Sequence, residues 1–203
     1  MQLNRPLAVV TPTLDADVLA VLARLDAPFT TGGLHRVLGA HSEEGIRKVL
    51  NRLSRQGIVD AQRAGPAFLY RLNRDHLAAS AVVELANLAS TFLARLEQRM
   101  ARWESPPVYA AVFGSAATGT MTPQSDLDLL LVHPDDVSRE VWDEQVDALL
   151  TDISRWTGND AQLLEFSAGR LAGAHDEPVL ADVLQHGLTV AGDRDWLKRK
   201  VRG

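Results

Sequence analysis

Residues 110–132 read AAVFGSAATGTMTPQSDLDLLLV. An apolar run ends at Gly114, and a stretch of small residues leads to a second apolar run that carries Asp126 and Asp128. Side chains two residues apart in a strand point to the same face, about 6.5–7 Å apart. We therefore expect both carboxylates on one face of the second strand. Two carboxylates on one face make an all-oxygen site suited to Mg²⁺.

Gly114 and Ser115 end the first apolar run with a tight backbone turn and a hydroxyl group. Backbone N–H groups in such a turn, helped by any helix that starts there, favour a bound phosphate. The alternative is a buried strand with two incidental acidic residues. Two aspartates inside an aliphatic strand are costly unless cations neutralise them, so the sequence favours a metal and phosphate site.

The stretch resembles the minimal nucleotidyltransferases of the polymerase-β-like superfamily. Their signature is Gly-Ser, ten residues, then Asp-x-Asp, and here ten residues separate Ser115 from Asp126. The segment SDLDLLLV is also similar to the second catalytic strand of that family. The resemblance implies transfer of a nucleoside monophosphate from a nucleoside triphosphate (NTP), with Mg²⁺ or Mn²⁺ as cofactor. Such transfers commonly use two metal ions about 3.5–4 Å apart.

The resemblance also implies a role for each residue of the motif. Asp126 and Asp128 would be the catalytic metal ligands, and Gly114 and Ser115 would hold the β- and γ-phosphates. Ser125 would fix the turn that presents the first aspartate.

Two positions depart from the family pattern. Thr118 stands where family members often have an arginine, so a triphosphate contact is lost or supplied from elsewhere. The third carboxylate of the family lies on the next strand, where the segment AQLL places Gln162. An amide cannot take a proton from an acceptor hydroxyl. Asp160 lies two residues earlier on the same strand face and could take this catalytic role, or it could be an ordinary turn residue. Glu165 should face away.

The first 75 residues show three helical segments followed by two alternating, strand-like segments. The expected helices begin near residues 15, 31 and 43, and the expected strands are residues 58–63 and 67–72. This order resembles a winged helix-turn-helix module, in which the third helix enters the major groove of DNA and the hairpin is the wing.

The third helix of this head would present one polar, basic face. Such a face suits phosphates and base edges. The candidate DNA-binding residues are Arg47, Lys48, Asn51, Arg52 and Arg55, with Arg63 on the hairpin. Arg71 on the hairpin could also reach a phosphate. A merely solvated helix face and a protein-interaction module are the alternatives.

Residues 75–103 carry a helical apolar stripe that predicts one helix of nearly thirty residues. The stripe is not a strict heptad, so we expect packing on the C-terminal domain, pairing in a homodimer, or both. An amphipathic helix over residues 138–156, a strand over 161–166, short helices and a last apolar run over 188–190 should follow. The basic tail from residue 194 is expected to fray.

Composition limits the protein class. The chain has 203 residues, no cysteine and a net charge of −5. It therefore has no disulfide framework, and one large or two small domains fit its length. Lacking a signal pattern and a long apolar run, it is expected to be cytoplasmic with no membrane partner. Residues 1–75 hold 10 Lys and Arg against 7 Asp and Glu, whereas residues 76–203 hold 11 against 19, which indicates two modules with different partners.

We therefore predict an α+β chain with three parts: a winged helix-turn-helix domain (residues 1–75), a connecting helix (76–104) and a nucleotidyltransferase domain with a small mixed sheet flanked by helices (105–203). The leading function is Mg²⁺-dependent nucleotidyl transfer to an unidentified acceptor, with DNA or a partner bound by the head. The alternative is a DNA-binding transcriptional regulator whose second domain is a catalytically reduced nucleotide sensor or dimerisation module. A third interpretation has a protein acceptor, as in toxin–antitoxin pairs that use minimal nucleotidyltransferases.

Overall fold

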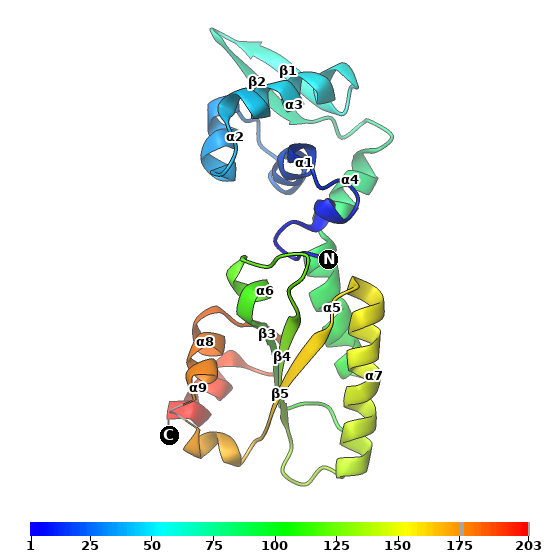
Figure 1. Ribbon diagram of the computed structural model, residues 1–203, viewed down its shortest axis with the longest axis vertical. Helices are drawn as coiled ribbons and strands as arrows, with labels where there is room; N and C mark the ends of the chain where they lie inside the picture. The colour runs from blue at the N-terminus through cyan, green and yellow to red at the C-terminus, as the bar shows by residue number, and fades with distance from the viewer. Residues whose placement is uncertain (175–176, 203) are drawn as a thin grey trace. The chain divides into compact units, whose positions relative to one another are not determined.

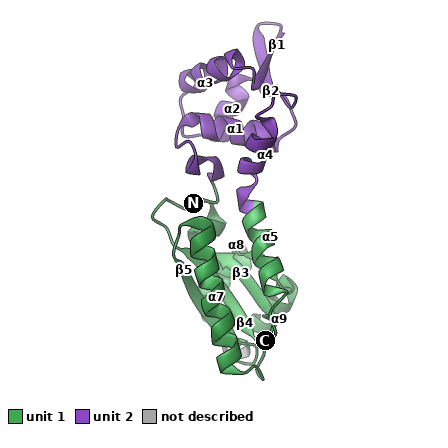
Figure 2. Ribbon diagram, turned by 90° about the vertical axis from the view of Figure 1, so that its right-hand side faces the viewer, with its two compact units in different colours: residues 1–4, 90–203 green, residues 5–89 purple. Residues whose placement is uncertain are grey.

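The structure is a computed structural model that describes residues 1–174 and 177–202. It divides into two compact units, drawn in separate colours in Figure 2. One unit comprises residues 5–89, and the other comprises residues 1–4 together with residues 90–203. The first four residues therefore group with the C-terminal half of the chain. They contribute a buried residue, Leu3.

The unit of residues 5–89 contains short helices and one hairpin. Its elements are η1 (Pro6–Val9), α1 (Leu14–Arg24), α2 (Thr31–Leu38), α3 (Glu43–Arg55), β1 (Val59–Ala64), β2 (Ala67–Leu72) and α4 (Ala79–Ala86). Side-chain caps begin two of the helices: Thr30 accepts from Gly33 N at 3.0 Å, and Ser42 accepts from Gly45 N at 3.1 Å. The three helices and the hairpin lie at the positions that the sequence predicts.

The hairpin is joined to the helices by a bridge that the sequence did not indicate. Strands β1 and β2 are antiparallel, and Phe29, between α1 and α2, pairs with Tyr70 of β2. The backbone N–H of each of these two residues donates to the carbonyl of the other at 2.8 Å. Apolar side chains of α1, α3 and the two strands form the core of this unit, which includes Val18, Leu22 and Leu50.

The prediction of one continuous connecting helix is wrong. The segment forms α4 and a separate α5 (Leu88–Met100), interrupted at Asn87. The two helices bury their stripes in different cores: Ala86 packs in the core of residues 5–89, whereas Phe92 and Leu96 are buried in the other unit. Among the described residues no single helix is long and apolar enough to cross a membrane, and α4 and α5 reach that length and composition only when counted together across their break.

The second unit is built on a mixed four-stranded sheet, as predicted. After α5, its elements are β3 (Tyr109–Phe113), α6 (Gly114–Thr118), β4 (Leu127–His133), α7 (Arg139–Thr157), β5 (Ala161–Ser167), η2 (Arg170–Gly173), α8 (Pro178–His186), β6 (Leu188–Ala191) and α9 (Arg194–Arg202). The strand order is β5-β4-β3-β6. Strand β4 is parallel to β5 and antiparallel to β3, which in turn is antiparallel to β6.

Helices cover both faces of this sheet, with α5 and α7 on one side and α8 and α9 on the other (Figure 1). Leu130 and Val132 of β4 pack with Leu180 of α8 and Leu197 of α9. The tail is therefore a helix with a buried apolar face, and the expectation that it frays is wrong. The short helix α6 likewise replaces the first part of the loop expected after Gly114.

Candidate functional site

The end of β3 and the start of β4 meet at a glycine. Phe113 lies opposite Asp128 in the antiparallel register, so the next residue, Gly114, passes the aspartate side chain. A Cβ atom placed on Gly114 would lie 2.2 Å from Asp128 Oδ2, and this glycine has φ +65°. The backbone conformation therefore favours glycine, and any other residue would also have to displace the Asp128 carboxylate. The chain turns directly from this contact into α6, whose second residue is Ser115.

The two predicted metal ligands lie on either side of the first residue of β4. Strand β4 begins at Leu127, so Asp126 belongs to the preceding turn and is exposed, whereas Asp128 is within the strand and partly buried. The expectation that both aspartates lie inside the strand is therefore wrong for Asp126. Leu127 and Leu129, on either side of Asp128, are buried, as are the next three residues of β4.

Burial raises the pKa of the Asp128 carboxyl above its ordinary value, and the charges of Asp126 and Asp182 raise it further. Asp182 belongs to α8 and was not among the sequence candidates. Its Oδ1 accepts a hydrogen bond from His186 Nδ1 at 3.0 Å, one helical turn further on. No local pattern in the sequence indicates that Asp182 lies near Asp128. Several carboxylates thus share one region, which favours a cation there.

Gln162 lies directly beside the predicted metal ligands. It is opposite Asp128 in the parallel register of β4 and β5, and its Nε2 donates to Asp126 Oδ2 at a long 3.4 Å. Glu165 faces the other side of the sheet, where it accepts from Trp142 Nε1 at 3.0 Å and pairs with Arg139 of α7. The prediction that Glu165 points away is confirmed.

Asp160 lies just before β5 with an exposed side chain. Its carbonyl accepts from Leu127 N at 2.8 Å, which places it next to the turn that carries Asp126. Asp160 and Gln162 both line a surface hollow of about 570 Å³. The other residues lining it are Leu150, Thr151, Ser154, Arg155 and Ala161. This hollow is open space within reach of both candidates for the third catalytic position.

The loop before β4 is held by polar side chains. Thr118 Oγ1 donates to Gly114 O at 3.0 Å, so this side chain turns back onto α6. Ser125 Oγ accepts from Thr122 N at 3.0 Å and closes the turn immediately before Asp126. The carbonyl of Ser125 accepts from Asn159 Nδ2 at 2.9 Å.

The candidate DNA-binding residues of α3 lie on its solvent-exposed face. All five of its sequence candidates are exposed: Arg47, Lys48, Asn51, Arg52 and Arg55. Two of the arginines have acidic partners in the same unit, because Arg47 pairs with Glu44 and Arg52 pairs with Asp15. Arg63 on the hairpin is exposed, and its Nε donates to Gly65 O at 3.4 Å.

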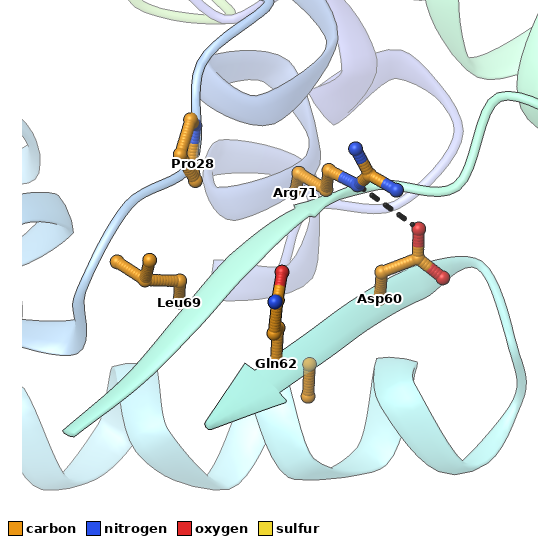
Figure 3. A pocket seen from close by; sticks show the side chains of 6 residues that line it. Pro28, Asp60, Gln62, Leu69 and Arg71 are labelled. Atoms are coloured by element: carbon orange, nitrogen blue, oxygen red, sulfur yellow. Dashed lines mark hydrogen bonds and ion pairs between the residues drawn. The ribbon is translucent and has the colours of Figure 1, made fainter. Parts of the chain in front are cut away.

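Figure 3 shows a hollow of about 300 Å³ on the face of the hairpin. Asp60, Gln62 and Leu69 line it together with Arg71 and Pro28. The dashed line marks the ion pair of Arg71 Nε with Asp60 at 3.2 Å, which joins β2 to β1. Arg71 thus has an acidic partner across the strands, as Arg47 and Arg52 of α3 also have, whereas Arg63 is exposed on the hairpin without a carboxylate partner among the ion pairs of the described residues.

The donor set of the site fits a hard divalent cation that arrives with a nucleotide. Among the described residues, no three His, Cys, Asp or Glu side chains are grouped closely enough to hold a metal by themselves. Mg²⁺ is commonly bound through one or two carboxylates, with phosphate oxygens and water completing its octahedron. Asp126 and Asp128 provide such a pair. The described geometry thus matches a shared metal–triphosphate site.

Residues 93–175 match the family model of the nucleotidyltransferase domain, so the chain contains a domain of this transferase class of enzymes. No curated protein matches the chain. A crystal structure of a MntA–HepT toxin–antitoxin complex is 11% identical, with a TM-score of 0.36 over 56% of this chain and 80% of the other. A toxin–antitoxin structure with AMP-PNP is 16% identical, with a TM-score of 0.36 over 52% and 81% of the two chains. These two likenesses are too low to indicate a function.

Asp128→Asn is expected to raise the melting temperature near neutral pH in the absence of metal. Because the pKa of Asp128 is raised, the folded state binds more protons than the unfolded state between the two pKa values, and stability falls as pH rises through that window. The amide removes this charge with little change of shape. The gain should shrink as the pH approaches about 3.9, the ordinary aspartate pKa.

The exposed neighbour provides the control. Asp126→Asn should give a smaller gain, because it removes a repelling charge but not the buried one. Thermal unfolding followed by tryptophan fluorescence reports on the unit that contains Asp126 and Asp128, since all four tryptophans lie in that unit, between residues 103 and 196. An Asp128→Asn protein that melts below the wild type at pH 7 would contradict the account of this carboxylate.

Proposed function

We propose that the second unit transfers a nucleoside monophosphate from an NTP to an acceptor hydroxyl, with Mg²⁺ or Mn²⁺ as cofactor. The observation that carries the proposal is the meeting of Gly114 with Asp128 at the junction of β3 and β4, with Asp126 one residue before the strand. The match of residues 93–175 to the nucleotidyltransferase domain supports the same reaction.

The reaction needs an in-line attack of the acceptor oxygen on the α-phosphorus, with the bond to the pyrophosphate oxygen breaking. When bound, the metal would neutralise phosphate charge. Asp126 and Asp128 would hold it, and Gly114 and Ser115 would receive the β- and γ-phosphates. Thr118 lies one helical turn after Gly114 and bonds back to its carbonyl, so it would shape the phosphate turn without adding a charge.

The third catalytic position separates two functions. If Asp160 accepts the proton of the acceptor, the domain is an enzyme. If Gln162 stands in for the lost base, the domain binds nucleotide and metal but transfers slowly, and the protein is a regulator with a nucleotide sensor. Gln162 supports this second function, because its amide lies opposite Asp128 and 3.4 Å from Asp126, and an amide cannot act as a base.

For residues 5–89 we propose a winged helix-turn-helix module that binds DNA. The exposed face of α3 and the antiparallel hairpin support this assignment. The ion pairs of Arg47 and Arg52 do not exclude phosphate binding, because exposed pairs contribute only about 0–1 kcal/mol and a phosphate can replace the carboxylate. The proposal also includes a cytoplasmic location, a homodimer, and a partner protein as one class of acceptor.

Mg²⁺ together with a triphosphate should raise the melting temperature of the wild type, because a ligand that binds only the folded state stabilises it. The double variant Asp126→Asn and Asp128→Asn should lose this rise. The comparison is the ligand-induced shift within each protein, since the variants differ in their own stability. An equal shift in the double variant would remove these residues from the site.

Gln162→Asp should raise transfer if glutamine has replaced the base, since a positioned base is typically worth about 10²–10⁴-fold in rate. If Asp160 is the base, the wild type should already turn over, and Asp160→Asn should stop it while leaving triphosphate affinity nearly intact. Transfer by the wild type and by each variant is measured by incubating the protein with a labelled NTP, Mg²⁺ or Mn²⁺, and cell extract as the source of the acceptor. Strong wild-type transfer that Asp160→Asn does not change, with no gain from Gln162→Asp, would contradict both accounts.

Neutralising Arg47, Lys48 and Arg52 together should weaken DNA binding and reduce the slope of affinity against salt by about one per lost phosphate contact. Fluorescence anisotropy with genomic fragments at several salt concentrations measures both quantities. A matched control neutralises three exposed cations of α9, Lys198, Arg199 and Lys200, and should bind as the wild type does. Wild-type protein that binds no fragment at low salt would exclude DNA and favour protein docking.

A further inference from the structure

The loop of residues 119–126 brings Asp126 to the site, although it contains no regular secondary structure. Within the loop, Ser125 Oγ accepts from Thr122 N and closes one turn. Among the hydrogen bonds of the described residues, the Asp126 side chain accepts only one, the long bond of 3.4 Å from Gln162 Nε2. A metal ligand must be held within about 0.5 Å of its productive position. The loop therefore needs support from other parts of the unit.

One support is Asn159, which connects α7 to β5. Its side chain is 4% exposed, and Nδ2 donates to Ser125 O at 2.9 Å. Its backbone N–H donates to Thr157 Oγ1 at 3.1 Å, and its Oδ1 accepts from the nitrogen of Met1. Both ends of the buried amide are thus satisfied. Since Ser125 O belongs to the peptide group that joins Ser125 to Asp126, Asn159 fixes the backbone next to the metal ligand.

The other support is the segment of residues 1–4, which runs along the same loop. Gln2 Nε2 donates to Met121 O at 2.9 Å, and Asn4 Nδ2 donates to Gly119 O at 2.8 Å. The backbone N–H of Leu3 lies 3.5 Å from the sulfur of Met121, and both of these side chains are buried. The segment therefore holds the beginning and middle of the loop, while Asn159 holds its end.

We propose that Asn159 is a positioning residue for the metal ligand Asp126, acting through the Ser125 carbonyl, and that residues 1–4 form a second layer of the same support. The inference rests on the proposed function of the site. Loss of the Asn159 bond would free the end of the loop and leave a buried carbonyl without its donor. Supporting groups of this kind typically change metal affinity by about 10–100-fold when they are removed.

The test compares Asn159→Asp with Thr157→Val. The first variant replaces the Nδ2 donor by an oxygen of similar size, so Ser125 O loses its partner. The second removes the hydroxyl that binds the Asn159 backbone but leaves the bond to Ser125. Hydrogen exchange of residues 119–126, without metal or nucleotide, measures the loop. Binding of Mn²⁺ with a non-hydrolysable triphosphate, followed by electron paramagnetic resonance, measures the site.

Asn159→Asp should speed exchange in the loop and weaken Mn²⁺ binding about 10–100-fold, whereas Thr157→Val should leave Mn²⁺ binding near that of the wild type. The double variant Gln2→Ala with Asn4→Ala, at two partly buried residues, should also speed exchange in the loop and weaken Mn²⁺ binding several-fold, and it decides the matter if Asn159→Asp does not fold. Unchanged Mn²⁺ affinity in the folded variants, or equal losses in Asn159→Asp and Thr157→Val, would overturn the inference. Wild-type protein that fails to bind Mn²⁺ with triphosphate would instead overturn the proposed function.

Discussion

The contact between the Asp128 carboxylate and Gly114 is the constraint on which the site depends. Gly114 has a positive φ of +65°, and a side chain at this position would also displace the Asp128 carboxylate. The contact brings the Gly114–Ser115 turn and the aspartate pair together. The contact has an electrostatic cost, because Asp128 is partly buried and lies near the negative charges of Asp126 and Asp182. A cation would remove that cost, which is the physical reason for expecting one.

Much of this site could be predicted from the sequence because its parts follow local rules. The Gly-Ser turn and the aspartate pair lie within one stretch, and alternation along a strand decides which face each side chain takes. The same rule predicted that Glu165 faces away, and the structure places it against α7. The helices of residues 5–89 were predictable for the same reason, since helical periodicity and the Ser42 cap are local signals.

The rest depends on contacts between distant residues, which periodicity does not encode. The apolar stripe over residues 75–103 is continuous in sequence, yet its two halves face different cores, and the helix breaks between them at Asn87. Asp182 reaches the region of Asp128 only because α8 packs on the same sheet face. Residues 1–4 hold a loop more than a hundred positions away through side-chain amides and one buried leucine. No motif marks such contacts in advance.

Gln162 bears on whether the second unit is an enzyme or a nucleotide sensor, because it stands at the position of the third carboxylate. Its amide lies beside Asp126 and carries no charge, so it lowers the negative charge of the site relative to a third carboxylate. A metal bound by two carboxylates and a triphosphate does not require that charge. In the proposed function, nucleotide binding would depend on Gly114 and the aspartate pair, whereas transfer would depend on a base for the acceptor. Asp160 and Gln162 both line the open hollow beside β5, so both candidates for the third catalytic position are accessible from the same space. A carboxylate there could accept a proton from an acceptor hydroxyl, whereas an amide could not.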